Sequence, residues 1–566
     1  MSAIDSWLRR TLGRAGWPIA LAGAVLMAVG TFLSWTYDPN IVENLTIYLY
    51  PAGPQVYTLI LALLAVVMLL AVRGPLATRP LGSLLPGGAG AARTAGVFSV
   101  LVVWLILVSI AVQLHGFVNI DPGGWVSGVG ALALFVGSRA LPDSPRPVLD
   151  WRLPSAVQII LIAVALLLVL TAAAYALNRS DAWVFIDFLL FLAGVVLMSR
   201  NLGILGYLAD ATARLRRVTL LAAFIVAFLF PFTQNGSDAN MSIATQVLIF
   251  ATTAIGLNIV VGLAGLLDLG YIAFLGSGAY VGAILSASAF THIHWHPPFL
   301  VVVLIGACVA ACFGLIIGSP TLRVSGDYLA IVTLAFGEIF RLTMNNLDGS
   351  NGPDLTNGPN GIPAIPDLRI GGFDFGEPHT VLGIELGRFA NYYFLLLVVI
   401  AFVVLAFARM NDSRIGRGWV AIREDERAAE AMGVNTFSLK LLAFAGGAFL
   451  AGLAGTIKAH HDVSVTPDQY QFLESAFLLS AVVLGGMGTV GGVLLGAVIL
   501  KLLPEKLRFF SDYRLLLFGL LLVVMMRFRP EGMLASRRRQ LELHEEDEEL
   551  AEELEGQVAD VEVAPR

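Results

Sequence analysis

Long apolar runs recur along this whole sequence, and they restrict what the chain can fold into more than any other feature. Hydrophobic residues make up 57% of its 566 residues and charged residues only 13%, whereas soluble domains carry about 25% charged residues. A helix that crosses the hydrocarbon core of a bilayer needs about 20 mainly apolar residues. The composition therefore excludes a soluble enzyme and predicts an all-α, polytopic membrane protein.

The apolar runs fall into two groups along the chain. We expect about 16 transmembrane helices, about 10 of them in the second group, at about 20 residues each. We predict a membrane module at 1–210, a membrane core at 211–535, and an acidic cytoplasmic tail at 536–566 whose charge run favours disorder. The runs at 472–486 and 488–503 are short and meet at a series of glycines, so we expect some core helices to be broken or re-entrant.

Arginine is distributed unequally between the loops of the first group. Loops on one predicted side contain only Arg179, and cytoplasmic loops are the ones enriched in Lys and Arg. We therefore expect both termini and residues 409–436 in the cytoplasm, and residues 346–390 outside. The arginines on the predicted cytoplasmic side are Arg9, Arg10, Arg14, Arg73, Arg79, Arg93, Arg139, Arg146, Arg152, Arg200, Arg214, Arg216 and Arg217.

The predicted cytoplasmic segment 409–436 has the pattern of short amphipathic helices. Apolar Trp419 and Ile422 alternate with charged residues, Gly433 suits a left-handed helix end, and Asn435 or the threonine after it can cap the next helix. Such a helix on the membrane face has the shape to dock into a groove of a soluble partner. From spacing alone, an ordinary charged loop fits equally well.

Four strings, taken together, resemble the permease subunits of ABC importers for branched-chain amino acids (leucine, isoleucine and valine). IREDERAAEAMGVNT in segment 409–436 is similar to the coupling loop of that family. The other three are GLNIVVGLAGLLDLGYIAFLGSGAYVGAI at 256–284, GDYLAIVTLAFGEIFRLTMNN with downstream TNGPNGI over 326–362, and FLESAFLLSAVVLGGMGTVGGVLLGAVIL at 472–500. The resemblance covers roughly 217–530. The module before it looks like an elaboration seen in some members, and its role is not predicted.

The resemblance implies a transport subunit of a bacterial inner membrane, with no enzymatic activity and no catalytic residues. Its implied partners are ABC ATPase subunits, a second homologous permease subunit, an extracytoplasmic solute-binding protein and membrane lipid, but no nucleic acid. The chain contains no G-x-x-x-x-G-K-[ST] string, the motif that cradles nucleotide phosphates. We therefore expect no cofactor in this chain, and ATP and Mg²⁺ on the partner subunits.

The resemblance also implies which residues meet the ATPase. In the general importer pattern Glu-Ala-Ala-x-x-x-Gly, Ala428, Ala429 and Gly433 fit, but Arg427 stands where the Glu would be. Two nearby carboxylates are possible substitutes for that Glu. The predicted coupling residues are Arg423, Glu424, Asp425, Glu426, Ala428, Ala429, Glu430 and Gly433.

Polar and small residues inside apolar runs are candidates for a translocation path. Six glycines interrupt the string at 256–284, and broken membrane helices expose backbone groups that can hold a zwitterionic solute. Close helix packing explains most single glycines in membranes equally well. Glu338 lies three residues from Arg341, so an internal ion pair is as plausible as solute contact. The path candidates are Asn258, Gly265, Asp268, Tyr271, Gly278 and Glu338.

Other functions stay open from the sequence alone. An ion-coupled secondary transporter of a small polar solute would need no partner and would bind its ion at Asp268, Asp327 and Glu338, although Asp327 is better placed as a helix N-cap. An ABC permease for urea, amides or aromatic acids would share the motifs. A membrane scaffold or enzyme is disfavoured because no catalytic constellation converges. No metal site is predicted, because neither a carboxylate nor a cysteine accompanies His292, His294 and His296.

Overall fold

The computed structural model divides into two compact units, Met1–Gln234 (unit 1) and Asn235–Arg566 (unit 2), which are described separately here. Within them the structure describes residues 3–73, 87–141, 149, 151, 153–179, 181–286, 295–321, 328–350, 352–381, 383–506, 513–528 and 532–534. The predicted three-part division, with boundaries at residues 210 and 535, stays a prediction. The acidic tail, Asp327, His292 and His294 lie outside the described residues.

Unit 1 is built from helices. In chain order these are α1 (Ala3–Leu12), η1 (Gly13–Ala15), α2 (Gly16–Gly30), α3 (Pro54–Arg73), α5 (Gly88–Gln113), η2 (Phe117–Asn119), α6 (Pro122–Arg139), α7 (Ser155–Leu177), α8 (Ala182–Asn201), α9 (Ile204–Arg214), α10 (Arg216–Leu229) and η3 (Phe230–Gln234). Helix α10, which the sequence assigns to the second group of runs, packs against α7 inside unit 1.

Helices α2 and α6 pack backbone to backbone along their whole length. A Cβ atom at Gly23 of α2 would lie only 2.7 Å from the carbonyl oxygen of Gly130 in α6. Similar close contacts between glycines recur every seven residues, forward along α2 and backward along α6. They pair Gly16 with Gly137 and Gly30 with Gly123. Small residues let membrane helices approach closely where no hydrophobic effect drives them together.

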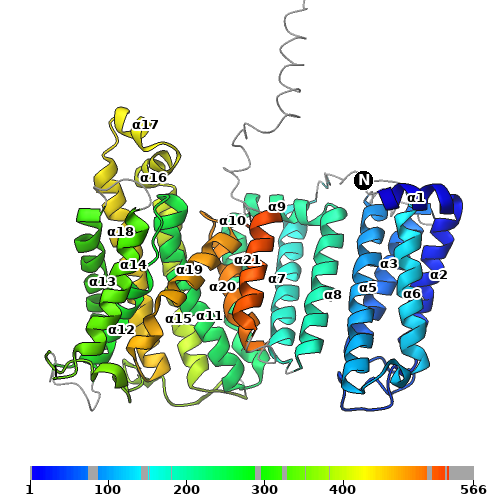
Figure 1. Ribbon diagram of the computed structural model, residues 1–566, viewed down its shortest axis with the longest axis horizontal. Coiled ribbons are helices and arrows are strands. Elements are labelled where there is room, and N and C mark those ends of the chain that lie inside the picture. Colours follow the sequence, from blue (N-terminus) through cyan, green and yellow to red (C-terminus); the bar gives the residue numbers. More distant parts are fainter. Residues whose placement is uncertain are drawn as a thin grey trace, which may run out of the picture. The chain divides into compact units, whose positions relative to one another are not determined.

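Unit 2 contains helices and two small antiparallel β-hairpins (Figure 1). Its elements are α11 (Asp238–Asn258), the π-helical turn η4 (Ile259–Leu263), α12 (Ile272–Leu285), α13 (Phe299–Thr321), α14 (Tyr328–Asn346), η5 (Gly358–Asn360), β1 (Arg369–Ile370), β2 (Phe373–Asp374), β3 (His379–Val381), β4 (Ile384–Leu386), α15 (Arg388–Asn411), α16 (Arg414–Glu424), α17 (Glu426–Ala431), α18 (Thr436–Asp462), η6 (Pro467–Tyr470), α19 (Phe472–Gly485), α20 (Val490–Lys506) and α21 (Arg514–Phe528).

The predicted fold class is confirmed, because the described chain is an all-α, multi-pass membrane protein. Each predicted apolar run coincides with one helix, and nine helices among the described residues are long and apolar enough to cross a membrane alone. Helix α19 has 14 residues, about 21 Å at 1.5 Å per residue, which is shorter than a hydrocarbon core of about 30 Å. It meets α20 at a break around Gly486, as the glycine series predicts.

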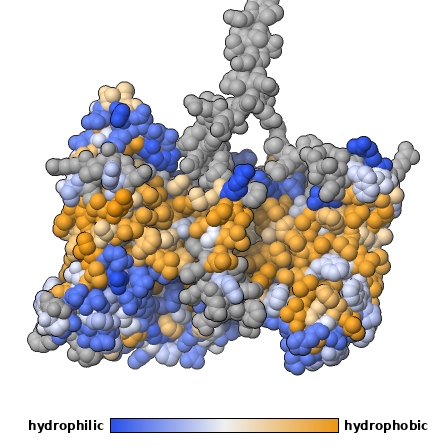
Figure 2. All heavy atoms as spheres, viewed as in Figure 1, coloured by the Kyte–Doolittle hydropathy of each residue, from blue (hydrophilic) through white to orange (hydrophobic). Residues whose placement is uncertain are grey.

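Helix α18 connects the two polar ends of unit 2. It has 27 residues, about 40 Å of helix. It begins just after α17, and we call this end of unit 2 the α17 end. It finishes beside the segment that carries the β-hairpins, and we call that end the loop end. Figure 2 shows hydrophilic side chains around α16 and α17 and at the opposite end of unit 2, with a hydrophobic band between them.

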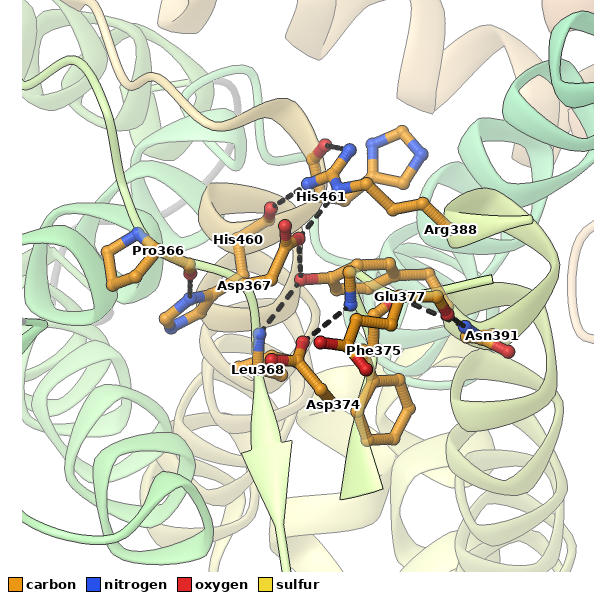
Figure 3. Close-up of polar contacts among 12 residues, drawn as sticks. Pro366, Asp367, Leu368, Asp374, Phe375, Glu377, Arg388, Asn391, His460 and His461 are labelled. Carbon is orange, nitrogen blue, oxygen red and sulfur yellow. Dashed lines mark hydrogen bonds and ion pairs between the residues drawn. The ribbon is translucent and has the colours of Figure 1, made fainter. Parts of the chain in front are cut away.

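At the loop end, Arg388 fastens the irregular segment to the last turn of α18 (Figure 3). Its Nη2 and Nη1 atoms donate to the carbonyl oxygens of His460 and His461 at 2.7 and 3.1 Å, and its Nε donates to Asp367 Oδ1 at 2.6 Å. The hydroxyl of Tyr392 donates to the same Asp367 oxygen at 2.9 Å. The last carbonyl groups of a helix lack partners within it, so Arg388 both caps α18 and holds the loop.

Close packing between α12 and α18 depends on glycine and gives a testable expectation. A Cβ atom at Gly455 would overlap the carbonyl oxygen of Leu275, whereas one at Gly446 on the same helix would meet only Met410 Cε at 3.5 Å. We expect Gly455→Ala to lower the free energy of unfolding by about 1–3 kcal/mol, the usual cost of overpacking.

Gly446→Ala is the matched control, and it should be neutral or slightly stabilising because alanine favours helix over glycine. The midpoint of thermal unfolding in detergent, followed by tryptophan fluorescence, measures both effects. Equal midpoints for the two variants would contradict the packing described.

Candidate functional site

The coupling segment, residues 413–435, consists of two short helices with a cap at each start. Ser413 Oγ accepts from the backbone N–H of Gly416 at 3.2 Å and begins α16, and Asp425 Oδ1 accepts from that of Ala428 at 3.0 Å and begins α17. Gly433 has a φ of +85°, the left-handed conformation typical after a helix end. Asn435 then caps α18, so both local signals in the sequence correspond to real features.

The inner face of the coupling segment is packed against the start of α18. Trp419 is fully buried, and its Nε1 donates to the carbonyl oxygen of Leu439 at 2.7 Å. Met432 is 85% exposed on the other face. We define the docking face as six of the exposed residues in this segment's second half, namely Glu424, Arg427, Ala428, Glu430, Ala431 and Met432.

Several predicted coupling residues serve the segment itself. Ala429 is buried, so it contributes to packing instead of to the docking face. Glu426 pairs with Lys440, a buried lysine in the first turns of α18. Asp425 caps α17. Glu424, Ala428, Glu430 and Gly433 remain as exposed predicted coupling residues, and their contact with an ATPase stays a prediction.

Arg423 links the coupling segment to the end of α11. Its Nη1 donates to the carbonyl oxygen of Gly262 at 2.9 Å, while Nη2 pairs with Glu424 Oε1 at 2.7 Å. Gly262 lies in the π-helical turn that ends α11. Gly265 has a φ of +71°, and a Cβ atom there would lie 2.5 Å from Arg423 Cγ, so the arginine side chain lies directly against the loop before α12.

Asn258 joins this helix break to the one between α19 and α20. Its side chain is fully buried, with Oδ1 accepting from the backbone N–H of Gly488 at 2.8 Å and Nδ2 donating to the carbonyl oxygen of Thr489 at 3.3 Å. A buried amide that satisfies two backbone groups released by a helix break removes a cost of several kcal/mol in lipid. This side chain at the end of α11 therefore stabilises the break between α19 and α20.

The structure gathers some predicted path residues and separates others. Asp268 is buried in the loop before α12, where its Oδ1 accepts from Gly270 at 2.9 Å, and Tyr271 donates to the carbonyl oxygen of Gly447 at 2.6 Å. Asn258, Gly265, Asp268 and Tyr271 thus all belong to the break between α11 and α12.

Gly278 and Glu338 lie elsewhere in unit 2. Gly278 is farther along α12, where its backbone packs against Gly452 of α18. Glu338 Oε2 pairs with Arg341 Nε at 3.0 Å, the internal pair that their spacing predicts. The role of both residues in a path stays a prediction. Within the described residues, no group of His, Cys, Asp and Glu is arranged to hold a metal ion.

Three lysines near the ends of apolar runs form ion pairs that the sequence patterns did not predict. Lys440 pairs with Glu426, Lys458 with Asp462, and Lys501 with Glu474. The available signal was an ionisable residue within a membrane helix, which is rare and usually functional.

Comparison with known proteins identifies the family of this chain. The family model described as "Branched-chain amino acid transport system / permease component" matches residues 240–526. The chain belongs to this family. The matched residues lie entirely within unit 2.

Named relatives of this permease family include LivM of Salmonella typhimurium, a high-affinity branched-chain amino acid transport system permease protein, which is 38% identical over 349 residues, 59% of this chain and 78% of the relative. The probable LivM of Methanocaldococcus jannaschii is 25% identical over 50% of this chain and 84% of its own length. LivH of Escherichia coli is 25% identical over 50% of this chain and 91% of its own length. No solved structure matches the chain.

The double hydrogen bond of Asn258 gives the second prediction. Asn258→Leu leaves the Gly488 N–H without its partner and leaves the Thr489 carbonyl group with only the 3.4 Å bond from the Val493 N–H, so we expect a loss of about 1–3 kcal/mol in the free energy of unfolding. Thr253→Val on the same helix is the control, because the Thr253 hydroxyl donates only to Ile249 within α11.

Thermal unfolding of the purified chain in detergent measures this difference. Proteolysis should also cut the variant faster between α19 and α20, because the turn there loses its support. If Asn258→Leu unfolds at the same temperature as Thr253→Val, the two breaks are not joined as described.

Proposed function

We propose that this chain is the membrane-spanning permease subunit of an ATP-driven importer for branched-chain amino acids in a bacterial inner membrane. The termini and the α17 end would face the cytoplasm, and the loop end would face outward. Family membership and the names of the relatives support this proposal. The observation that carries it is the coupling segment, which exposes one face and holds the broken end of α11 through Arg423.

The proposed assembly contains three kinds of partner. ABC ATPase subunits, which bind the ATP and Mg²⁺, would dock on the docking face. A second homologous permease would complete the path, which the likeness to both LivM and LivH supports. An extracytoplasmic solute-binding protein would dock on the loop end, whose hydrophilic hairpins are held by Arg388.

In this proposal the chain converts movement of the ATPases into a change of access. Closure of the ATPases on ATP would displace the docking face. Arg423 would carry that displacement to the Gly262 turn, and Asn258 would carry it on to the break between α19 and α20. Access would then alternate between two states that bind ATP differently, since a ligand shifts an equilibrium only through such a difference. No bond of the solute is made or broken.

The third prediction tests the docking face. Met432→Glu places a charge on an exposed apolar side chain without disturbing the packed face of the segment. We expect the yield of ATPase subunits that purify with the chain, and the rate of leucine uptake, to fall roughly tenfold, which corresponds to about 1.4 kcal/mol of binding free energy.

Val381→Glu is the matched control, since Val381 is an exposed apolar residue at the loop end and should leave ATPase binding unchanged. ATPase binding that survives Met432→Glu would contradict the proposed contact. Uptake that persists after ATP depletion and stops when the ion gradient collapses would instead support an ion-coupled transporter.

A further inference from the structure

A cavity of about 190 Å³ lies in unit 2 where α11, α12, α18, α19 and α20 approach one another, beside the final turns of α18. None of the six path candidates from the sequence lines this cavity. Its size suits a small solute, since an engineered apolar cavity of about 150 Å³ binds benzene.

Two ion pairs line the cavity. Lys458 pairs with Asp462 one turn later on α18, and Lys501 Nζ of α20 lies 3.3 Å from Glu474 Oε2 of α19. The other oxygen of Asp462 lies 2.6 Å from His461 Nδ1. The two lysines and two carboxylates together carry no net charge, so the cavity offers both signs of charge in equal number.

Apolar side chains supply the rest of the cavity's lining. Ile249 and Phe250 of α11 and Ile272 and Leu275 of α12 are all buried and all line it. Lys501 Nζ lies 4.7 Å from the centre of the Phe250 ring, so the charged and apolar parts of the lining are adjacent. This lining is complementary to a solute that carries an ammonium group, a carboxylate and an apolar side chain.

Structural stabilisation accounts poorly for the pair of Lys501 and Glu474. The side chains of Lys501 and Glu474 are 31% and 36% exposed, and ion pairs of that exposure contribute about 0–1 kcal/mol. Ionisable groups within membrane segments are costly and are usually retained for a function. Replacing such an ion pair by apolar residues of similar volume is often neutral or stabilising in proteins.

We propose that this cavity is a transient binding site for a free amino acid with an aliphatic side chain, held as its zwitterion. The solute carboxylate binds Lys501, its ammonium group binds Glu474, and its side chain packs on Phe250 and Ile249. This inference rests on the proposed function and adds to it a site for the solute within this chain.

Binding of a zwitterion keeps every charge paired. Lys501 exchanges Glu474 for the solute carboxylate, and Glu474 exchanges Lys501 for the solute ammonium group. An acid without the ammonium group, or an amine without the carboxylate, leaves one protein charge unpaired in a partly buried site, which costs free energy. The cavity therefore selects leucine over isocaproate and over isoamylamine.

The fourth prediction concerns uptake of radiolabelled leucine by cells in which this chain is the only copy. We expect Lys501→Met and Glu474→Gln each to reduce the initial rate at least tenfold, while membrane abundance and ATPase binding stay unchanged. Lys501→Arg keeps the charge and should retain uptake. Lys506→Met, on the same helix but outside the cavity lining, is the control and should also retain uptake.

A binding measurement separates the site from transport. The purified full-length chain in detergent is irradiated with photoactivatable leucine, and labelled peptides are mapped by mass spectrometry. We expect label on the α11 and α12 peptides that contain Phe250 and Ile272, competed by leucine but not by isocaproate or isoamylamine. Lys501→Met should abolish this label.

The outcomes distinguish the site from the proposed function. If leucine uptake requires the chain but both charge-removing variants retain it and the cavity peptides stay unlabelled, the binding site is overturned and the proposed function stands. If deletion of the chain leaves leucine uptake unchanged, the proposed function fails, and the site fails with it.

Discussion

Backbone groups released by a break in a membrane helix must find partners inside the protein, because lipid offers none. Among the described residues of unit 2, membrane helices are broken after α11 and after α19, and side chains from distant elements supply the partners. Asn258 serves the Gly488 turn, and Arg423 serves the carbonyl group of Gly262. The two breaks and the coupling segment therefore share one hydrogen-bond network, in which movement of one member strains the bonds of the others.

Helix α18 provides a second connection from the same segment. Trp419 and Glu426 hold its first turns, and Arg388 holds its last carbonyl groups about 30 Å away. A packed helix of this length moves as a rigid body, because protein interiors deform little. In the proposed mechanism, a displacement of the coupling segment would therefore reach the helix breaks through Arg423 and the loop end through α18.

Local sequence signals account for much of this architecture. Apolar runs predict the helices, the glycine series predicts the break after α19, and the three-residue spacing predicts the Glu338–Arg341 pair, since all of these depend on neighbours in the chain. Hydrogen bonds between residues that are distant in the chain leave no such signal in the sequence. Arg423 and Gly262 are 161 residues apart, and any carbonyl group presents the same acceptor.

The charged residues of the cavity show the same difference between contacts of sequence neighbours, which can be predicted, and contacts of distant residues, which cannot. Lys458 and Asp462 are four residues apart, a spacing that places them together on one helix face, so this pair was accessible from sequence. Glu474 and Lys501 meet only because α19 and α20 fold back on each other. Gly278 shows the converse, because a glycine within an apolar run looks the same whether it faces a solute or, as here, the backbone of Gly452.

The departure of the coupling segment from the general importer pattern also has a structural answer. Arg427 occupies the position of the expected Glu, and the neighbouring Glu426 is held by Lys440. Glu430 follows Arg427 by three residues and therefore lies on the same helix face, exposed on the docking face. The segment thus presents the carboxylate of Glu430 about one turn after the usual position, and Arg427 occupies that usual position. A partner groove that accepts this face must offer a cation for Glu430 and a negative or neutral contact for Arg427, so charge, as well as shape, would determine which ATPase fits the proposed contact.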